Sequence, residues 1–238
     1  MKKYTITFIM VLFTNIIFAQ NAMEPVFKYF SGFLDETKAE LAVGELMEKY
    51  FIKSVSNSNK IEINEELTKR MNEYAQLSLR KNIQYKVYVI ESELADEILL
   101  PNGTLFLTSK ILSYATTYYQ QDFLLARNVI HMVYKHPIKM LKKSGIYPTF
   151  LKQLKMKPED QEINKINSAI REYLVQIGLM DYTKADVECI KLTKDPEKVR
   201  LSSIEMLEKF KSSVWPAISF NQTDIPQRIK LLKELKAN

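Results

Sequence analysis

The residues of this chain with the clearest capacity for chemistry lie in one short segment. Its two histidines are His131 and His136, and Arg127 and Asn128 come shortly before the first of them. A neutral imidazole can bind a metal ion, and two imidazoles chelate best when they lie on the same side of a helix. A spacing of five residues turns His131 and His136 about 140° apart on an ideal helix, so we expect a poor chelating pair.

The period of the apolar residues predicts the elements around this segment. A helix is expected over residues 121–135, ended by Pro137. Strands are expected over residues 85–90 and 104–108, because both are rich in β-branched and aromatic side chains and a Pro-Asn-Gly turn signal lies between them. We expect these two strands to be antiparallel neighbours.

The rest of the chain reads mainly as helix. Helices are predicted over residues 62–80, 159–177, 182–193, 196–211 and 225–236, one or two more over 25–53, and a short one around Ile111 and Leu112. The fold class is therefore α+β and predominantly helical, with a small sheet.

The first residues have the pattern of a secretory signal peptide. Lys2 and Lys3 precede an apolar run that ends at Ala19, which is shorter than the roughly 20 residues of a spanning helix. We predict a signal peptide over residues 1–19 and an exported protein of the periplasm or cell envelope. The alternative is an uncleaved anchor, and only in that case do we expect membrane association.

Composition and charge exclude an internal disulfide and argue against nucleic-acid binding. The single cysteine, Cys189, rules out an internal disulfide. The formal charge of +6 falls to +4 without Lys2 and Lys3, and the basic residues alternate with acidic ones along the predicted helices. We therefore expect a solvated surface and no nucleic-acid partner.

Four segments in order along the chain carry a family resemblance. Residues 96–108 read DEILLPNGTLFLT, 125–131 read LARNVIH before Lys135 and His136, 182–186 read YTKAD, and 227–232 read QRIKLL. They are similar to the NAFALPGGYIYVT hairpin, the LAHEIGH helix with its following RH, the ExxAD helix start and the closing RIxxL of zinc metallopeptidases of the HtpX and CAAX prenyl protease type. The resemblance implies a gluzincin-like domain over residues 61–238, with a small antiparallel sheet beside the former active-site helix. Residues 20–60 would form an amino-terminal helical segment.

The same resemblance indicates that the catalytic groups are missing. In this family two histidines and the ExxAD glutamate bind zinc, and the glutamate after the first histidine acts as general base. Arg127 stands at the first ligand position and offers no lone pair. Asn128 stands at the base position without usable basicity, and Tyr182, with a phenol pKa of about 10, replaces the glutamate ligand. Only His131 survives as a ligand position, so we expect neither zinc nor another cofactor, and no catalysis.

Two aspartates are candidates to surround this altered site. We expect the Arg127 guanidinium to occupy the space of the missing metal ion and to pair with Asp186 or Asp181. The late histidine of the family, which helps to hold the oxyanion, is replaced by Gln222 or Asp224, depending on the alignment.

One strand is a candidate for recognition. In the family an edge strand beside the active-site helix pairs with extended substrate, and backbone pairing needs no metal. We therefore predict that one strand pairs with substrate through its backbone. The residues of this predicted substrate strand are Thr104, Leu105, Phe106 and Leu107. The alternative is that the strand is purely structural.

The sequence thus predicts an exported, catalytically inactive relative that binds a polypeptide or an envelope partner in the old cleft, in a setting of protein quality control. One alternative is a working zinc metallopeptidase with unorthodox ligands: His131, Asp181 or Tyr182, and Asp186. Another is an unrelated helical envelope protein. That alternative predicts that no two helices cross near His131 and Tyr182.

Overall fold

The computed structural model describes residues 36–177, 182–211 and 224–235. Contacts divide the chain into two units, residues 1–39 and 40–238, and all the predicted site residues belong to the second. The predicted signal peptide, much of the first predicted helix, Asp181 and Gln222 lie outside the described residues. Within the described ranges, no helix has the length and apolar character needed to cross a membrane.

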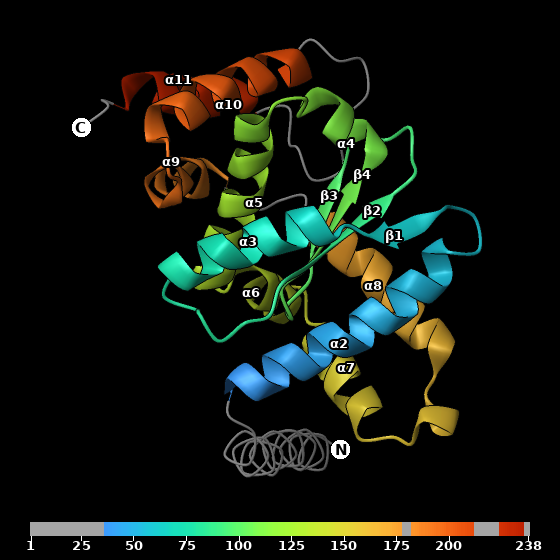
Figure 1. Ribbon diagram of the computed structural model, residues 1–238. Coiled ribbons are helices and arrows are strands. Elements are labelled where there is room, and N and C mark those ends of the chain that lie inside the picture. Colours follow the sequence, from blue (N-terminus) through green and yellow to red (C-terminus); the bar gives the residue numbers. More distant parts are fainter. Residues whose placement is uncertain (1–35, 178–181, 212–223, 236–238) are drawn as a thin grey trace, which may run out of the picture. The chain divides into compact units, whose positions relative to one another are not determined.

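Helices make up most of the described chain, and the α+β, predominantly helical class is correct (Figure 1). Their bounds are α2 (Glu36–Val55), α3 (Glu65–Leu77), α4 (Ser109–Tyr114), α5 (Tyr118–Val133), α6 (His136–Lys143), α7 (Tyr147–Leu154), η1 (Pro158–Asp160), α8 (Ile163–Ile177), α9 (Thr183–Leu192), α10 (Pro196–Lys211) and α11 (Ile225–Glu234). Helices α6 and α7 occupy residues for which the apolar pattern predicted no separate helix.

Four strands form one mixed sheet in the order β1-β2-β4-β3. Their bounds are β1 (Ile61–Ile63), β2 (Lys86–Ile90), β3 (Glu97–Leu99) and β4 (Thr104–Thr108). Strands β2 and β4 pair in parallel, so the prediction of antiparallel neighbours in an antiparallel sheet is wrong. The turn at residues 101–103 joins β4 to β3, which is the antiparallel partner of β4 in the hairpin. β3 is only three residues long and begins with Glu97, and this hid it from the strand pattern.

Helix α2 packs on one face of this sheet. The ring of Phe51 lies 4.6 Å from that of Phe106 on β4, edge to face. The compact unit starts at Glu40, ahead of residue 61, where the sequence placed the start of the metallopeptidase-like domain.

A buried carboxylate joins α2 to the β3–β4 turn. Glu48 accepts hydrogen bonds from the Asn102 amide at 2.6 Å and the Thr104 hydroxyl at 2.9 Å, and Lys86 lies 2.9 Å from its other oxygen. One helical turn earlier, Gly44 lies so close to Asn102 that an added Cβ would be 2.2 Å from its backbone nitrogen. The residues Glu48, Lys86, Asn102 and Thr104 are called the Glu48 network below.

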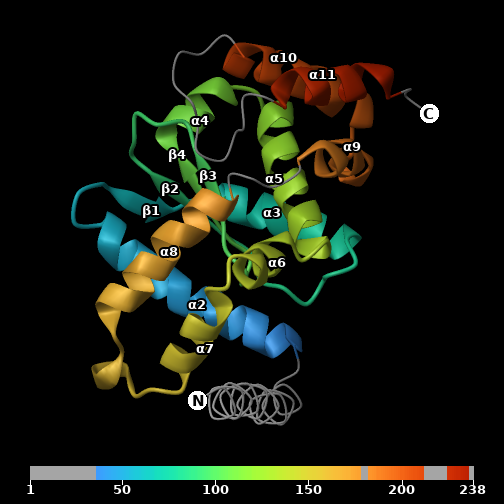
Figure 2. The same cartoon turned by 180° about the vertical axis from the view of Figure 1, so that it is seen from behind.

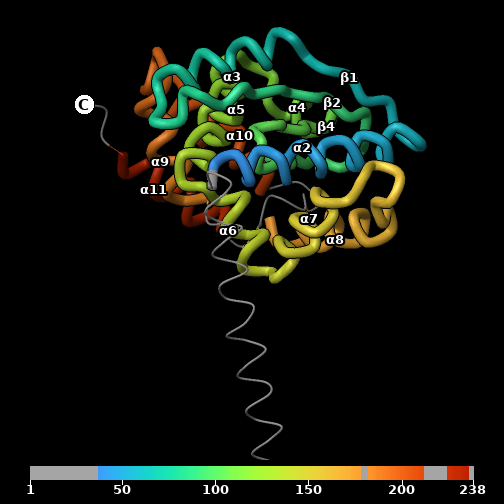
Figure 3. The backbone as a smooth tube through the Cα atoms, turned by 90° about the horizontal axis from the view of Figure 1, so that it is seen from below, coloured from blue at the N-terminus to red at the C-terminus, as the bar shows by residue number. Residues whose placement is uncertain are grey.

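Helix α5 is the central helix of the unit, in contact with α3, α9 and α10 (Figure 3). It begins with a capping box in which Thr117 and Gln120 satisfy each other's backbone N–H groups. It ends at Val133, before the expected Lys135, because Lys135 adopts a left-handed conformation with φ of 56°. Pro137 therefore lies in the first turn of α6 and does not itself end α5.

Candidate functional site

The sequence-predicted site residues meet where α5 and α9 pack together. The ring of Tyr182, just before α9, lies edge-on against His131 of α5, with ring centroids 4.9 Å apart. Arg127 is one turn before His131, and Asp186 is one turn after Tyr182. All four side chains are no more than 1% exposed. Two segments about fifty residues apart thus form one buried site.

Arg127 makes the central contacts of this site. Its guanidinium lies 2.5 Å from a carboxylate oxygen of Glu97 and 3.5 Å from one of Asp186. The prediction that Arg127 would pair with Asp186 or Asp181 is therefore confirmed for Asp186. Glu97, on β3, was not predicted as a site residue. A charged residue at the start of the short apolar run of β3 was the signal that could have identified it.

Asn128, at the predicted general-base position, acts as a hydrogen-bond donor. Its amide nitrogen donates to the second oxygen of Glu97 at 3.1 Å and to the carbonyl of Leu124 at 2.9 Å. The Glu97 carboxylate is thus held by two successive residues of α5. An amide used in this way positions a carboxylate and cannot take a proton from water.

A second arginine completes the site from α11. Arg228 binds both oxygens of Asp186, at 2.6 and 3.2 Å, in a bidentate pair. The Tyr182 ring lies between the two guanidinium groups, 5.2 Å from that of Arg127 and 4.9 Å from that of Arg228. We call Arg127, Arg228, Glu97, Asp186 and Tyr182 the arginine cluster. Two positive and two negative charges balance within it, as buried ions require.

The electrostatics of the cluster hold its residues in fixed protonation states. Burial opposes the charge on Arg127, but the nearby carboxylates of Glu97 and Asp186 outweigh that effect and raise its pKa. The pKa of Tyr182 is well above its ordinary value, first because of burial and then because of Glu97. Tyr182 therefore stays protonated, and a neutral phenol is a weak ligand for zinc.

The two histidines converge, contrary to the geometry expected for one continuous helix. Their Nδ1 atoms lie 2.7 Å apart, so one imidazole donates a hydrogen bond to the other. The reason is the left-handed residue Lys135, which redirects the chain between them. Burial, followed by the charges of His136, Arg127 and Arg228, lowers the pKa of His131 well below its ordinary value. His131 is thus neutral, and its buried Nε2 has no hydrogen-bond partner among the described residues.

The resemblance implies a zinc ion at this position. The Nε2 of His131 has no hydrogen-bond partner among the described residues, and it offers a lone pair to a metal in the tautomer whose Nδ1 carries the proton. The other positions do not match: Arg127 and Asn128 present donors, and Asp186 is bound by Arg228 on both oxygens. Among the described residues, no three His, Cys, Asp or Glu side chains are grouped to hold a metal. The residues present therefore do not fit zinc.

The predicted substrate strand, residues 104–107, lies inside the sheet. As part of β4 it is hydrogen-bonded to β2 on one side and β3 on the other, so it has no free edge and cannot add a substrate strand. The outer strand here is β3, beside α8 (Figure 2). Its edge is partly satisfied, because the carbonyl of Leu99 accepts from the Tyr173 hydroxyl and the N–H of Glu97 donates to the Asp96 carboxylate at 2.8 Å.

Comparison with models of known protein families found no match, and a search of curated proteins found no similar sequence either. The likeness to metallopeptidases therefore rests on the ordered motifs. The packing of their residues around Arg127 is a separate observation.

Proposed function

We propose that this chain is an exported, catalytically inactive protein on a metallopeptidase-like scaffold, and that it acts by binding a polypeptide or an envelope partner. The observation that carries the proposal is the position of Arg127. A permanently charged guanidinium is buried against Glu97 and Asp186, where the resemblance calls for a zinc ligand. A cation that belongs to the chain supplies the positive charge there.

The pattern of retained and altered motif residues supports this reading. Arg228 and Asp186 match the RIxxL and ExxAD motifs, and they form the bidentate pair. Arg127 and Glu97 depart from their motifs, where the family has histidine and alanine, and they are paired with each other. A new buried positive charge and a new buried negative charge compensate one another. Two unrelated departures would not be expected to meet.

The rival readings fit less well. A working enzyme with unorthodox ligands would need Asp186 together with Asp181 or Tyr182. Arg228 binds both oxygens of Asp186, and the raised pKa of Tyr182 keeps its phenol protonated. An unrelated helical protein predicts no crossing near His131 and Tyr182, whereas their rings are in contact.

Recognition in the old cleft would use β3, because β4 has no free edge. All three residues of β3 are buried, so an extended polypeptide could pair with β3 only after α8 moves away and Tyr173 releases the carbonyl of Leu99. The variant Tyr173→Phe removes that hydroxyl and should strengthen binding of unfolded casein, measured by fluorescence anisotropy. Unchanged binding in Tyr173→Phe would move recognition away from this edge.

The direct test of inactivity combines elemental analysis with a cleavage assay. We expect the purified chain to contain far less than one zinc per molecule and to leave unfolded casein intact. Stoichiometric zinc together with cleavage that a chelator abolishes would overturn the proposal.

A restoration variant tests the register of the motifs. Arg127→His, Asn128→Glu and Tyr182→Glu together rebuild the ligands and the base, but they leave Glu97 without its partner. Adding Glu97→Ala removes that bare carboxylate. We expect the fourfold variant to bind one zinc ion more tightly than the threefold one. If the fourfold variant folds, as judged by circular dichroism, yet binds no zinc, the alignment is wrong.

A further inference from the structure

Two leucines protrude at the end of α3. Leu77 is 64% exposed and Leu79 is 91% exposed, the highest value among the exposed large apolar residues that the structure describes. Exposing apolar surface of this size in water is unfavourable, and a cluster of it marks a contact site more often than a single residue does.

The backbone around Leu79 is held in place. On one side, the buried Ser78 hydroxyl donates to the carbonyl of Ala75 at 2.8 Å and accepts from the N–H of Arg80. On the other side, the Arg80 guanidinium points inward, to Glu40 at 2.8 Å and to the carbonyl of Met132 at 2.9 Å. Leu79 is therefore displayed outward between two anchored residues. A backbone that is already held in place loses little entropy when Leu79 binds.

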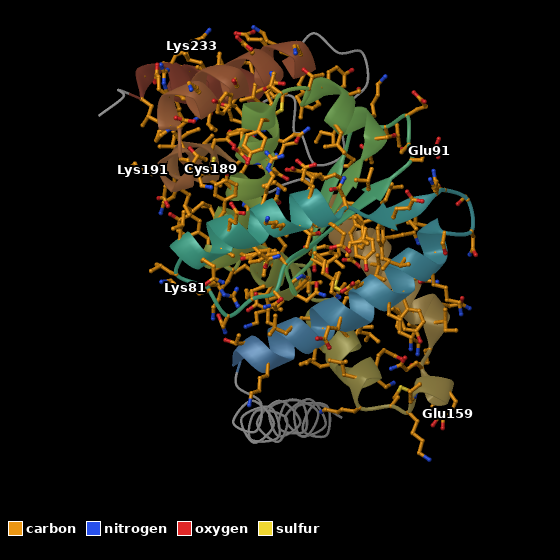
Figure 4. The ribbon with its side chains drawn as sticks, viewed as in Figure 1. Lys81, Glu91, Glu159, Cys189, Lys191 and Lys233 are labelled. Carbon is orange, nitrogen blue, oxygen red and sulfur yellow. The ribbon has the colours of Figure 1, made fainter. Side chains whose placement is uncertain are left out.

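Two lysines lie close to this end of α3. Lys81 follows Leu79 by two residues, and Lys194 reaches from the end of α9 to within 3.3 Å of Glu73, which precedes Leu77 by one helical turn. Lys81 and Lys191 lie on the same side of the molecule, opposite Glu91 (Figure 4). Both are exposed, and neither has an ion-pair partner in the part of the chain that the structure describes. We call Leu77, Leu79, Lys81 and Lys194 the leucine–lysine patch.

We propose that the leucine–lysine patch binds the surface of a membrane that contains anionic lipids. Leu77 and Leu79 enter the boundary between headgroups and acyl chains, while the lysines contact the negatively charged headgroups. This contact is independent of the amino-terminal apolar segment and goes beyond the proposed binding of polypeptides.

The shape and charge of the patch favour lipid over a protein partner. Protein interfaces are enriched in aromatic residues and depleted in lysine, whereas this patch has neither feature. Its most exposed residue is a single aliphatic side chain on a rigid turn, which suits shallow insertion. The lysines at its margin complement a surface of negative charge.

The experiment uses the full chain and vesicles of phosphatidylcholine with or without phosphatidylglycerol. A cysteine introduced as Leu79→Cys carries an environment-sensitive dye, since the native Cys189 is fully buried. Leu94→Cys is the matched control, because Leu94 is 49% exposed and follows Glu93, whose carboxylate faces Lys110 at 4.0 Å and offsets its charge. The dye reports contact at its own position even if residues 1–19 also bind the vesicle.

We expect the dye at position 79, and not at 94, to shift to shorter wavelength with phosphatidylglycerol vesicles, and the shift to shrink at high salt. With the dye at 79, Lys81→Glu should weaken the shift, and Leu79→Ser should lower vesicle binding about tenfold in sedimentation. Equal shifts at 79 and 94, or no shift at 79, would overturn the proposal. So would self-association of the unlabelled chain in the absence of vesicles that Leu79→Ser abolishes, which would point to a protein contact.

Discussion

The arginine cluster and the Glu48 network stabilise buried carboxylates in different ways. Both contain buried carboxylates. In the arginine cluster, Glu97 and Asp186 face two arginines whose own side chains are fully buried. Glu48 faces three neutral donors, the Asn102 amide and the hydroxyls of Thr104 and Tyr88, and the ammonium of Lys86, whose side chain is 45% exposed. A charge sealed from water needs an opposite charge beside it. A carboxylate near the surface can instead be satisfied by ordinary hydrogen bonds and a partly solvated lysine.

The largest effect is expected from breaking the arginine cluster. Arg127→Met should lower the free energy of unfolding by about 3–5 kcal/mol, because Glu97 would be left buried without its cation. Denaturant unfolding followed by circular dichroism measures this. Arg127→Met with Glu97→Leu should regain most of the loss, and Lys86→Met in the Glu48 network should have a much smaller effect. If Arg127→Met and Lys86→Met lower the free energy of unfolding equally, exclusion of water does not explain the difference between the two regions.

A smaller loss in the free energy of unfolding is expected from a steric clash between α2 and the β3–β4 turn, next to the Glu48 network. Gly44→Ala would place a methyl group 2.2 Å from the backbone nitrogen of Asn102, which only a backbone shift can relieve. We expect a loss of about 2–3 kcal/mol in the free energy of unfolding. Gly145→Ala is the control: it has nothing within 4 Å, so only its φ of +77° should count, about 1 kcal/mol. Equal losses would contradict close packing at Gly44.

The charge of Glu48 should matter less than that of Glu97. Glu48→Gln keeps the shape and can still accept one hydrogen bond, so we expect a loss of about 1–2 kcal/mol. Glu97→Gln, which removes the partner of a sealed arginine, should lose more. Thermal unfolding of the two variants side by side measures the difference. The opposite order would reverse the comparison between the regions.

The smallest effect is expected in the pH dependence of the free energy of unfolding, to which His131 contributes next to the arginine cluster. Because the pKa of His131 is lowered in the folded state, the unfolded chain takes up a proton below about pH 6.5 that the folded chain does not. The free energy of unfolding should therefore fall with decreasing pH below that value, by at most about 1.4 kcal/mol per pH unit from this group. His131→Gln should remove this contribution. A slope that persists in His131→Gln would assign it to other groups.

Local patterns predicted more than non-local pairings did. The bounds of α10 and the meeting of Arg127 with Asp186 follow from helical period and motif order. The parallel pairing of β2 and β4 does not, because a three-residue strand with one charged end gives no periodic signal. The contact between His131 and His136 depends on one left-handed residue, and a lysine at that position carries no sequence mark of it.

The charge pairs of the site show the same limit. Glu97 has no motif to mark it, and the RIxxL motif that contains Arg228 gives no sign of its pairing with Asp186. Only the folded chain brings the two residues to α5 and α9. Burial of charge is decided by tertiary contacts, so a sequence reveals a charge but not whether water reaches it.

The pairing of Arg127 with Glu97 also constrains how such a chain can change over generations. A substitution at either position alone leaves a bare charge in the interior, so the two sites, thirty residues apart, are coupled. In an alignment of relatives we expect positions 97 and 127 to vary together, as an acid with a base or as two uncharged residues. Under the proposed function, a change of Arg127 to a metal-binding histidine would have to pass through a less stable intermediate, so a metal site at this position would be difficult to regain.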